Sequence, residues 1–233
     1  MKVMDANELY DPEFRKLIKS KKPTIIIPVG SLEQHGAHLP ITTDSDIVTE
    51  IASRLAKKCG FIVLPTVNYG ISEEHDPFFN ISLDKQTLLK ILKNIDSSLF
   101  KNKYHMKSII ILNGHHGNEN ALKLAECNDN PPSGVFSYWH FMKHEFDHAG
   151  FVETSIMLAI SDKVKMKKAK KGLITKGMSE KEIQRIGKLS TEPGGFPKVA
   201  KNGVWGDPTG ATKKDGEKFL AEIVRNLAKE CQS

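Results

Sequence analysis

The sequence predicts an α/β fold built around a mostly parallel central sheet. In the first half of the chain, short apolar runs typical of strands alternate with amphipathic segments typical of helices, and this alternation favours parallel strands joined by crossover helices. The length of 233 residues fits one compact domain. No internal repeat and no linker rich in Pro, Gly or Ser divides the chain, so we expect residues 1–233 to form a single domain.

Three buried strands are predicted first, at residues 24–28, 61–64 and 108–112. Each run is rich in β-branched or other apolar residues, and the first two end at Pro or Gly, which interrupt regular structure. A continuous apolar run without alternation is typical of a strand that is covered on both faces.

Helices are predicted between and after these strands. In residues 44–58 the apolar side chains of Ile47, Ile51 and Leu55 recur every four positions, as on one face of a helix, and Gly60 suits a helix end. The same reasoning predicts further helices at residues 82–100, from 119 onward, at 153–160 and at 213–229. Residues 164–181 are lysine-dense and are interpreted as a solvated face or loop, and residues 194–212 as a long irregular loop.

Composition narrows the class of protein. A hydrophobic content of 39% with 27% charged residues is typical of a soluble globular protein, and no apolar run approaches the roughly 18 residues that a membrane span needs. The N-terminus lacks the apolar core of a signal peptide. The three cysteines are widely spaced with no CxxC pair, which argues against a disulfide framework or a Cys-rich zinc site. We expect a cytoplasmic protein with no membrane partner.

The net charge of +6 raises the alternative of nucleic-acid binding. Only four of the 34 basic residues are arginines, whereas arginine is the side chain that recognises phosphate and guanine through two hydrogen bonds. A lysine-coated soluble surface is therefore the preferred interpretation, and no nucleic-acid partner is expected.

Polar, histidine-rich segments follow each of the three predicted strands, at residues 28–44, 68–79 and 113–118. In open α/β sheets ligands bind at the carboxyl ends of the strands, where these segments emerge. We therefore expect the three loops to meet at one edge of the sheet.

The first loop carries Glu33, His35 and Asp44 within twelve residues. Glu33 and His35 are two positions apart, so in an extended segment both side chains point to the same side. A mixture of imidazole and carboxylate ligands suits Zn, Mn or Fe better than calcium or copper. The alternative is a hydrogen-bonded loop in which these residues cluster by accident.

Two further clusters carry histidine. Glycines flank His115 and His116 after the third strand, which lets the backbone approach closely there. His148 and Glu153 lie near the predicted start of a helix, where they would present an acid–base pair. The alternative for this third cluster is a helix cap made by Asp147 or Thr154 with an incidental histidine.

The motifs together resemble the creatininase (creatinine amidohydrolase) family. The most specific is Pro28-Val-Gly-Ser-Leu-Glu-Gln-His-Gly-Ala-His-Leu-Pro40 followed by Asp44. The resemblance continues in order through nearly the whole chain, in Tyr69-Gly-Ile-Ser-Glu-Glu-His75, Asn113-Gly-His-His-Gly-Asn118, His148-Ala-Gly-Phe-Val-Glu-Thr-Ser155 and Gly203-Val-Trp-Gly-Asp-Pro208.

This resemblance implies a three-layer α/β/α sandwich and a hydrolase with two divalent metal ions (Zn, Mn or Fe) that cleaves a non-peptide C–N bond of a small amide. By position, Glu33 and His115 would bind one ion, His35 the other, and Asp44 both. His148 would be the catalytic histidine and Glu153 the acidic residue of the same motif. The same resemblance implies substrate contacts at the three positions His116, Ser72 and Trp139, and a homo-oligomer, commonly a hexamer.

One position departs from creatininases proper. Their third motif resembles Asn-Gly-His-Tyr-Glu-Asn, in which Glu completes the shell of the second metal, whereas this chain has Gly117. Glu153 or a water is expected to fill the gap, unless the second site is weak. Sequences of this glycine type include the archaeal formylaminopyrimidine deformylases of flavin and deazaflavin biosynthesis and a peptide-trimming enzyme of mycofactocin maturation, so creatinine itself is not the expected substrate.

The expected mechanism needs no nucleophilic side chain, and the sequence contains no G-x-S-x-G motif. A divalent cation lowers the pKa of bound water from 15.7 towards about 7, and His148 would then protonate the leaving nitrogen. The alternative from another class is a non-catalytic metal- or ligand-binding protein on the same fold.

Overall fold

The computed structural model describes residues 5–101, 106–125 and 133–231. Its centre is a four-stranded sheet in the order β2-β1-β3-β4, in which every neighbouring pair is parallel. The strands are β1 (Thr24–Val29), β2 (Ile62–Val63), β3 (Ser108–Asn113) and β4 (Ser133–Ser137). The predicted α/β fold with a parallel sheet is confirmed.

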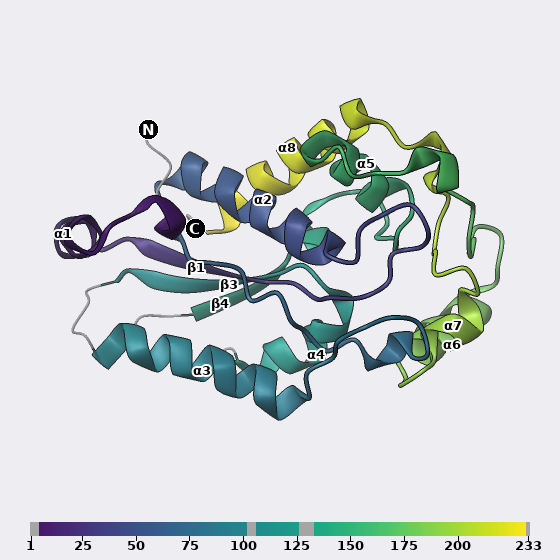
Figure 1. The fold of residues 1–233 in the computed structure, drawn as a ribbon, viewed down its shortest axis with the longest axis horizontal. Helices are drawn as coiled ribbons and strands as arrows, with labels where there is room; N and C mark the ends of the chain where they lie inside the picture. The colour runs from purple at the N-terminus through teal and green to yellow at the C-terminus, as the bar shows by residue number, and fades with distance from the viewer. Residues whose placement is uncertain (1–4, 102–105, 126–132, 232–233) are drawn as a thin grey trace.

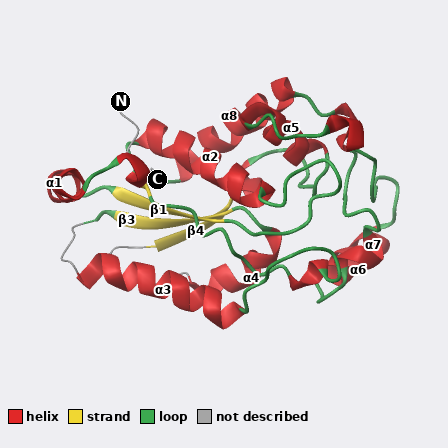
Figure 2. Ribbon diagram, viewed as in Figure 1, coloured by secondary structure: helices red, strands yellow, loops and turns green. Residues whose placement is uncertain are grey.

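Helices cover both faces of this sheet and give three layers (Figures 1 and 2). One face carries α2 (Thr43–Cys59), α5 (Phe151–Ile160) and α8 (Lys213–Glu230), and the other carries α3 (Lys85–Lys101) and α4 (Glu119–Leu122). The helix α1 (Asp11–Lys21) lies beyond the amino ends of the strands, whereas α6 (Glu180–Ser190) and α7 (Phe196–Val199) lie beyond their carboxyl ends.

The strands bury both of their faces, which explains their continuous apolar sequence. Ile26 and Ile110 belong to the core under α2, α5 and α8, whereas Ile25 and Ile109 belong to the core under α3. Because successive side chains of a strand point to opposite faces, one run of isoleucines supplies both cores.

Most predicted elements are confirmed, with shifted ends. The second strand is shorter than predicted, and α3 begins at Lys85 instead of residue 82. Residues 164–181 contain only the short 3-10 helix Met166–Lys168 before α6 begins, and residues 194–212 are irregular apart from α7 and the 3-10 helix Pro208–Gly210. The predicted helix from residue 119 continues as a 3-10 turn to Ala125, and residue 126 lies outside the described residues.

Four of the described helices and strands were not predicted: α1, α6, α7 and β4. The start of α6 carries a capping box, in which Ser179 and Glu182 bond to each other's backbone N–H, and this signal in the sequence was overlooked. β4 has the sequence Ser-Gly-Val-Phe-Ser, which is too short and polar to indicate a strand. It forms because the backbone of β3 offers it a partner along its whole length.

The loops after the strands are bonded to one another at the carboxyl edge of the sheet. The Asn118 side chain donates to Gly30 O at 3.0 Å and accepts from the Ile71 N–H at 2.8 Å. The backbone N–H of Gly114 donates to Val29 O at 2.8 Å. The predicted meeting of the three loops is thus confirmed. Among the described residues, no helix combines the length and the apolar character that crossing a membrane needs.

The close packing of α8 on α5 depends on Gly216, because a Cβ there would collide with Ser155 O and lie 3.0 Å from the Ala159 Cβ. We predict that Gly216→Ala lowers the free energy of unfolding by about 1–3 kcal/mol, as overpacking does. Gly187→Ala in α6 is the matched control, since a Cβ there meets nothing within 4 Å and alanine favours a helix by roughly 0.5–1 kcal/mol. Urea unfolding of both variants tests this, and equal effects would contradict it.

Candidate active site

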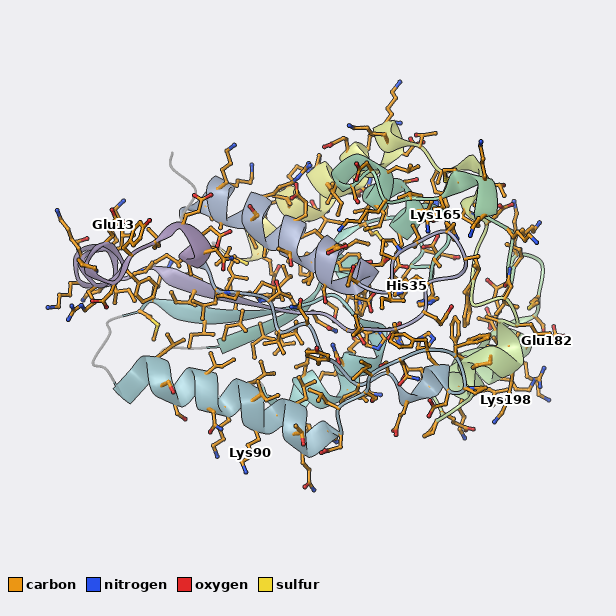
Figure 3. All side chains as sticks on the ribbon, in the orientation of Figure 1. Glu13, His35, Lys90, Lys165, Glu182 and Lys198 are labelled. Carbon is orange, nitrogen blue, oxygen red and sulfur yellow. The ribbon has the colours of Figure 1, made fainter. Side chains whose placement is uncertain are left out.

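Four of the predicted metal-binding side chains meet at the carboxyl edge of the sheet. Glu33 and His35 come from the loop after β1, Asp44 from the first turn of α2, and His115 from the loop after β3. All four are nearly inaccessible to solvent. Figure 3 shows His35 inside the molecule beyond the strand ends, whereas the labelled Lys90 and Glu182 lie on its outside.

The Asp44 carboxylate lies between two imidazoles. Its Oδ1 is 3.1 Å from His35 Nε2, and its Oδ2 is 3.0 Å from His115 Nδ1. The other ring nitrogens face backbone carbonyls, since His35 Nδ1 is 3.2 Å from Glu33 O and His115 Nε2 is 2.8 Å from Ile71 O. When each ring is neutral, as a metal ligand must be, donation to these carbonyls leaves one unprotonated nitrogen of each ring facing a different oxygen of Asp44.

Four sets of three donor residues could hold a metal ion among the described residues, and two of these sets share Asp44. The first of these two is Glu33, Asp44 and His115, and the second is His35, Asp44 and Glu153, with the atoms of each set within 4.8 Å of one another. The sets without Asp44 are Glu33, His35 and His148, and Glu33, Glu74 and His75. Glu33 Oε1 and Asp44 Oδ2 are buried and accept no well-directed hydrogen bond from the described residues, although His75 Nε2 lies 2.9 Å from the first and His115 Nδ1 3.0 Å from the second. Buried carboxylate oxygens without a hydrogen bond are costly unless a cation compensates them. The residues therefore fit a pair of divalent cations bridged by Asp44.

Charge coupling within the cluster shifts the pKa values of its members. Burial alone lowers the pKa of His35, but the carboxylates of Asp44, Glu153 and Glu33 outweigh it and raise that pKa to about 10. Burial raises the pKa of Glu153 to about 8, opposed by His35. Burial acts to raise the pKa of Asp44 too, yet His35 and His115 hold it well below its usual range. Since metal ligands must be deprotonated, cation binding at neutral pH releases protons from this cluster.

The first turn of α5 supplies the second set with its third ligand, Glu153. Glu153 Oε2 accepts from the Ala149 N–H at 2.7 Å and lies 3.6 Å from His35 Nε2. Asp147 accepts from the Val152 N–H at 2.8 Å, so it satisfies the first turn of the helix, and burial raises its pKa to about 6. The helix-capping alternative thus describes Asp147, while Glu153 faces the metal-binding cluster.

His148 lies beside the cluster and is held from its backbone. Its N–H donates to Trp205 O at 3.1 Å, and the Trp205 N–H donates back to His148 O at 2.8 Å. The ring centroid is 4.3 Å from that of His35, and Nδ1 is 3.8 Å from Glu33 Oε1. Burial, together with the neighbouring His35 and His75, holds the pKa of His148 well below its usual value, so the imidazole is neutral at pH 7.

A cavity of about 170 Å³ opens onto these groups. Aromatic rings of Phe146, Phe196 and Trp205 form part of its wall, and Glu74 and Asp147 contribute carboxylates. Among the described residues, neither lysine nor arginine lines it. The enclosed volume is below the roughly 300 Å³ typical of sites for drug-sized ligands, so the cavity suits a small group of low negative charge.

The predicted substrate contacts differ in their placement. His116 lines the cavity. Ser72 is fully buried and does not line it, and Trp139 lies behind the wall, with its ring 4.8 Å from that of Phe146 and 6.0 Å from that of His116. For Ser72 and Trp139 this placement argues against direct contact with substrate, because other side chains separate them from the open space.

Sequence reasoning gave no role to Gln34, Glu74 or His75. The Gln34 amide nitrogen lies 3.0 Å from His75 Nδ1 and 3.1 Å from His148 Nε2, and its oxygen accepts from the Gly36 N–H. His75 Nε2 in turn lies 2.9 Å from Glu33 Oε1. The consecutive Glu-His pair in the loop after the second strand was the available signal in the sequence.

Comparison with known proteins gives a family and several relatives. Residues 7–231 match the family described as creatinine amidohydrolase. A mycofactocin precursor peptide peptidase from Mycobacterium ulcerans (strain Agy99) is 32% identical over 221 residues, which cover 89% of this chain and 84% of the relative. Creatinine amidohydrolase from Pseudomonas putida is 27% identical, over 66% of this chain and 71% of the relative.

The solved structures show the same fold. A crystal structure of creatinine amidohydrolase (creatininase) has a TM-score of 0.82 at 24% identity and covers 99% of this chain and 97% of its own. The three-layer arrangement expected from the sequence is therefore confirmed. Related structures are described as a Zn-Zn type mutant creatininase, with a TM-score of 0.81, and as creatininase Mn, with a TM-score of 0.82.

The two oxygens of Asp44 lead to a prediction about metal content. Replacing Asp44 by Ala removes one ligand from both sets, so we expect the variant to lose both cations, whereas Asp46→Ala in the same helical turn keeps them. Elemental analysis of protein purified without chelators measures this. Full metal content in the Asp44 variant would show that the carboxylate does not bridge.

Proposed function

Since the chain belongs to the creatininase family of amidohydrolases, we propose that this enzyme hydrolyses the C–N bond of a small, uncharged amide at a centre of two divalent cations. The observation that carries the proposal is the Asp44 carboxylate, whose two oxygens face His35 and His115 from opposite sides. The family match over residues 7–231 also supports the prediction of one catalytic domain in residues 1–233.

The ligands are proposed as the two sets that share Asp44. Glu33, Asp44 and His115 would hold one cation, and His35, Asp44 and Glu153 the other. Glu153 would thus take the place left open by Gly117. Bound Zn or Mn would supply Lewis acidity, which polarises a carbonyl and lowers the pKa of water.

The protein's own contribution to the reaction centres on His148. Because its imidazole is neutral, it can accept a proton as water attacks the carbonyl carbon, and then pass that proton to the nitrogen of the leaving group. Such proton transfer by a positioned side chain contributes typically 10²–10⁴-fold to the rate. Its backbone bonds to Trp205 and the Gln34 amide at its Nε2 hold the ring in place.

The charge of the cavity supports an uncharged substrate. Three relatives illustrate the possible substrate classes. Two are described as a peptide peptidase and as creatinine amidohydrolase. The third, from Methanosphaera stadtmanae, is described as a deformylase of a ribosylaminopyrimidine 5'-monophosphate and is 41% identical over 40% of this chain and 40% of the relative. A phosphate would meet the carboxylates of Glu74 and Asp147 in the described cavity, where only the proposed cations, and no lysine or arginine, could pair with it. A lactam, formamide or cyclic urea without phosphate avoids this conflict.

A panel of amides tests the proposal. Protein loaded with Zn or Mn is expected to hydrolyse at least one lactam, formamide or cyclic urea, and His148→Ala is expected to lower kcat by about 10²–10⁴-fold while retaining both cations. His140→Ala, which changes an exposed histidine, serves as the control and should leave kcat unchanged.

Other outcomes of this panel contradict the proposal. Stoichiometric metal with no hydrolysis of any amide favours the non-catalytic binding protein. Cleavage of short peptides alone places the chain with the peptide peptidases, and a strict need for phosphate contradicts the preference for an uncharged substrate.

We also propose a homo-oligomer, as the family resemblance implies. Ile41, Phe79 and Ile81 are exposed apolar side chains, and the backbones of these three residues bond to residues 32–34 of the ligand-bearing loop. Light scattering is expected to give a mass above that of the 26.0 kDa monomer. Phe79→Ser should lower this mass, whereas Tyr10→Ser before α1 should not, and a monomeric wild type would refute the proposal. The cytoplasmic location stays a prediction.

A further inference from the structure

Glycine at position 117 leaves a space that another residue occupies. A Cβ built on Gly117 would lie 2.6 Å from Glu74 Oε1 and 2.5 Å from His115 Nε2, and it would collide with Ile71 O. Glu74 belongs to the 3-10 helix Glu73–His75 in the loop after β2, not to the loop that carries Gly117. The carboxylate next to His115 is therefore supplied from a different segment of the chain.

The Glu74 carboxylate lies against the outer nitrogen of His115. Its Oε1 is 3.2 Å from His115 Nε2, the same nitrogen that lies 2.8 Å from Ile71 O. The inner nitrogen, Nδ1, faces Asp44 Oδ2 at 3.0 Å. Glu74 is itself mostly buried, although its carboxylate also lines the cavity.

We propose that Glu74 is a positioning residue, which orients His115 for the metal and raises its affinity as a ligand. This inference rests on the proposed function. A metal-binding histidine usually donates its second N–H to a carboxylate or carbonyl, which fixes the tautomer and makes the ligating nitrogen more basic, and loss of such a partner typically costs 10–100-fold in metal affinity.

A second observation points to the same cation. Glu33 Oε1 is fully buried and accepts no well-directed hydrogen bond from the described residues, while Glu33 Oε2 lies 3.2 Å from His115 Nε2 and accepts from the Ser31 hydroxyl at 3.0 Å. One oxygen of Glu33 is thus held by the Ser31 hydroxyl. The other lies 2.9 Å from His75 Nε2 without a well-directed hydrogen bond, which leaves it as a candidate ligand. Gly117 is then the residue that makes room for Glu74, and a side chain at 117 would displace the positioning carboxylate.

Calorimetric titration of metal-free protein with Zn tests the inference. We expect Glu74→Ala to weaken the binding of one of the two cations by 10–100-fold, and Glu74→Gln, which still accepts a hydrogen bond without the charge, to weaken it less. Glu73→Gln is the control, because this neighbouring side chain is exposed. Circular dichroism of each metal-free variant checks that the fold is kept. If Glu74→Ala does not fold, the titration of Glu74→Gln alone tests the inference.

Two results overturn the inference. Either both cations bind the Glu74 variants with wild-type affinity, or the wild type binds a third equivalent of Zn that the variants lose, which would make Glu74 a direct ligand. The titration uses no substrate, so failure to hydrolyse any amide would count against the proposed function and leave this result standing.

Discussion

The site depends on one shared carboxylate. Asp44 is buried at the start of α2 and faces an imidazole with each oxygen. A buried carboxylate costs folding free energy unless a positive charge or hydrogen bonds compensate it. The two oxygens of Asp44 point towards groups from two other segments, the loops after β1 and β3. Asp44 thereby sets the positions of the two loops and the orientation of the histidine rings. It also provides a ligand that two cations can share, which holds them close enough to act on one amide.

This arrangement requires the fold that surrounds it. Parallel strands bring the loops after β1, β2 and β3 to the same edge, and Asn118 bonds to two of them there. Gly30 belongs to this framework because a Cβ would lie 2.7 Å from Ser45 Cα. The glycine lets the turn after β1 approach the first turn of α2 closely, which puts Asp44 beside His35.

The sequence indicated the centre of the site better than its surroundings. Glu33, His35, Asp44 and His115 lie in segments that begin where predicted strands end, so the parallel order of the strands predicts that they meet at one edge of the sheet. Glu74 could not be assigned in this way, because its contact with His115 depends on how the loop after β2 folds back over a glycine in another loop. Gln34 could not be assigned from the sequence either. Its amide nitrogen lies between two histidines because its amide oxygen accepts from the Gly36 N–H, and this orientation is known only from the structure. β4 likewise forms through its pairing with β3 and not through its own sequence.

These contacts change the interpretation of Gly117 as a residue of the metal site. In the sequence, Gly117 stands where creatininases proper have a metal-binding glutamate. This absence favours a weak second metal site or a protein without activity. In the structure, carboxyl groups from two other segments approach the two histidine ligands. Glu153 approaches His35 from α5, and Glu74 approaches His115 from the loop after β2. A carboxyl group therefore lies on each side of Asp44, one as a candidate ligand and the other behind a ligand. Loss of a single side chain at position 117 is thus a weak argument against catalysis, since charge and coordination belong to the whole cluster and not to one position in a motif.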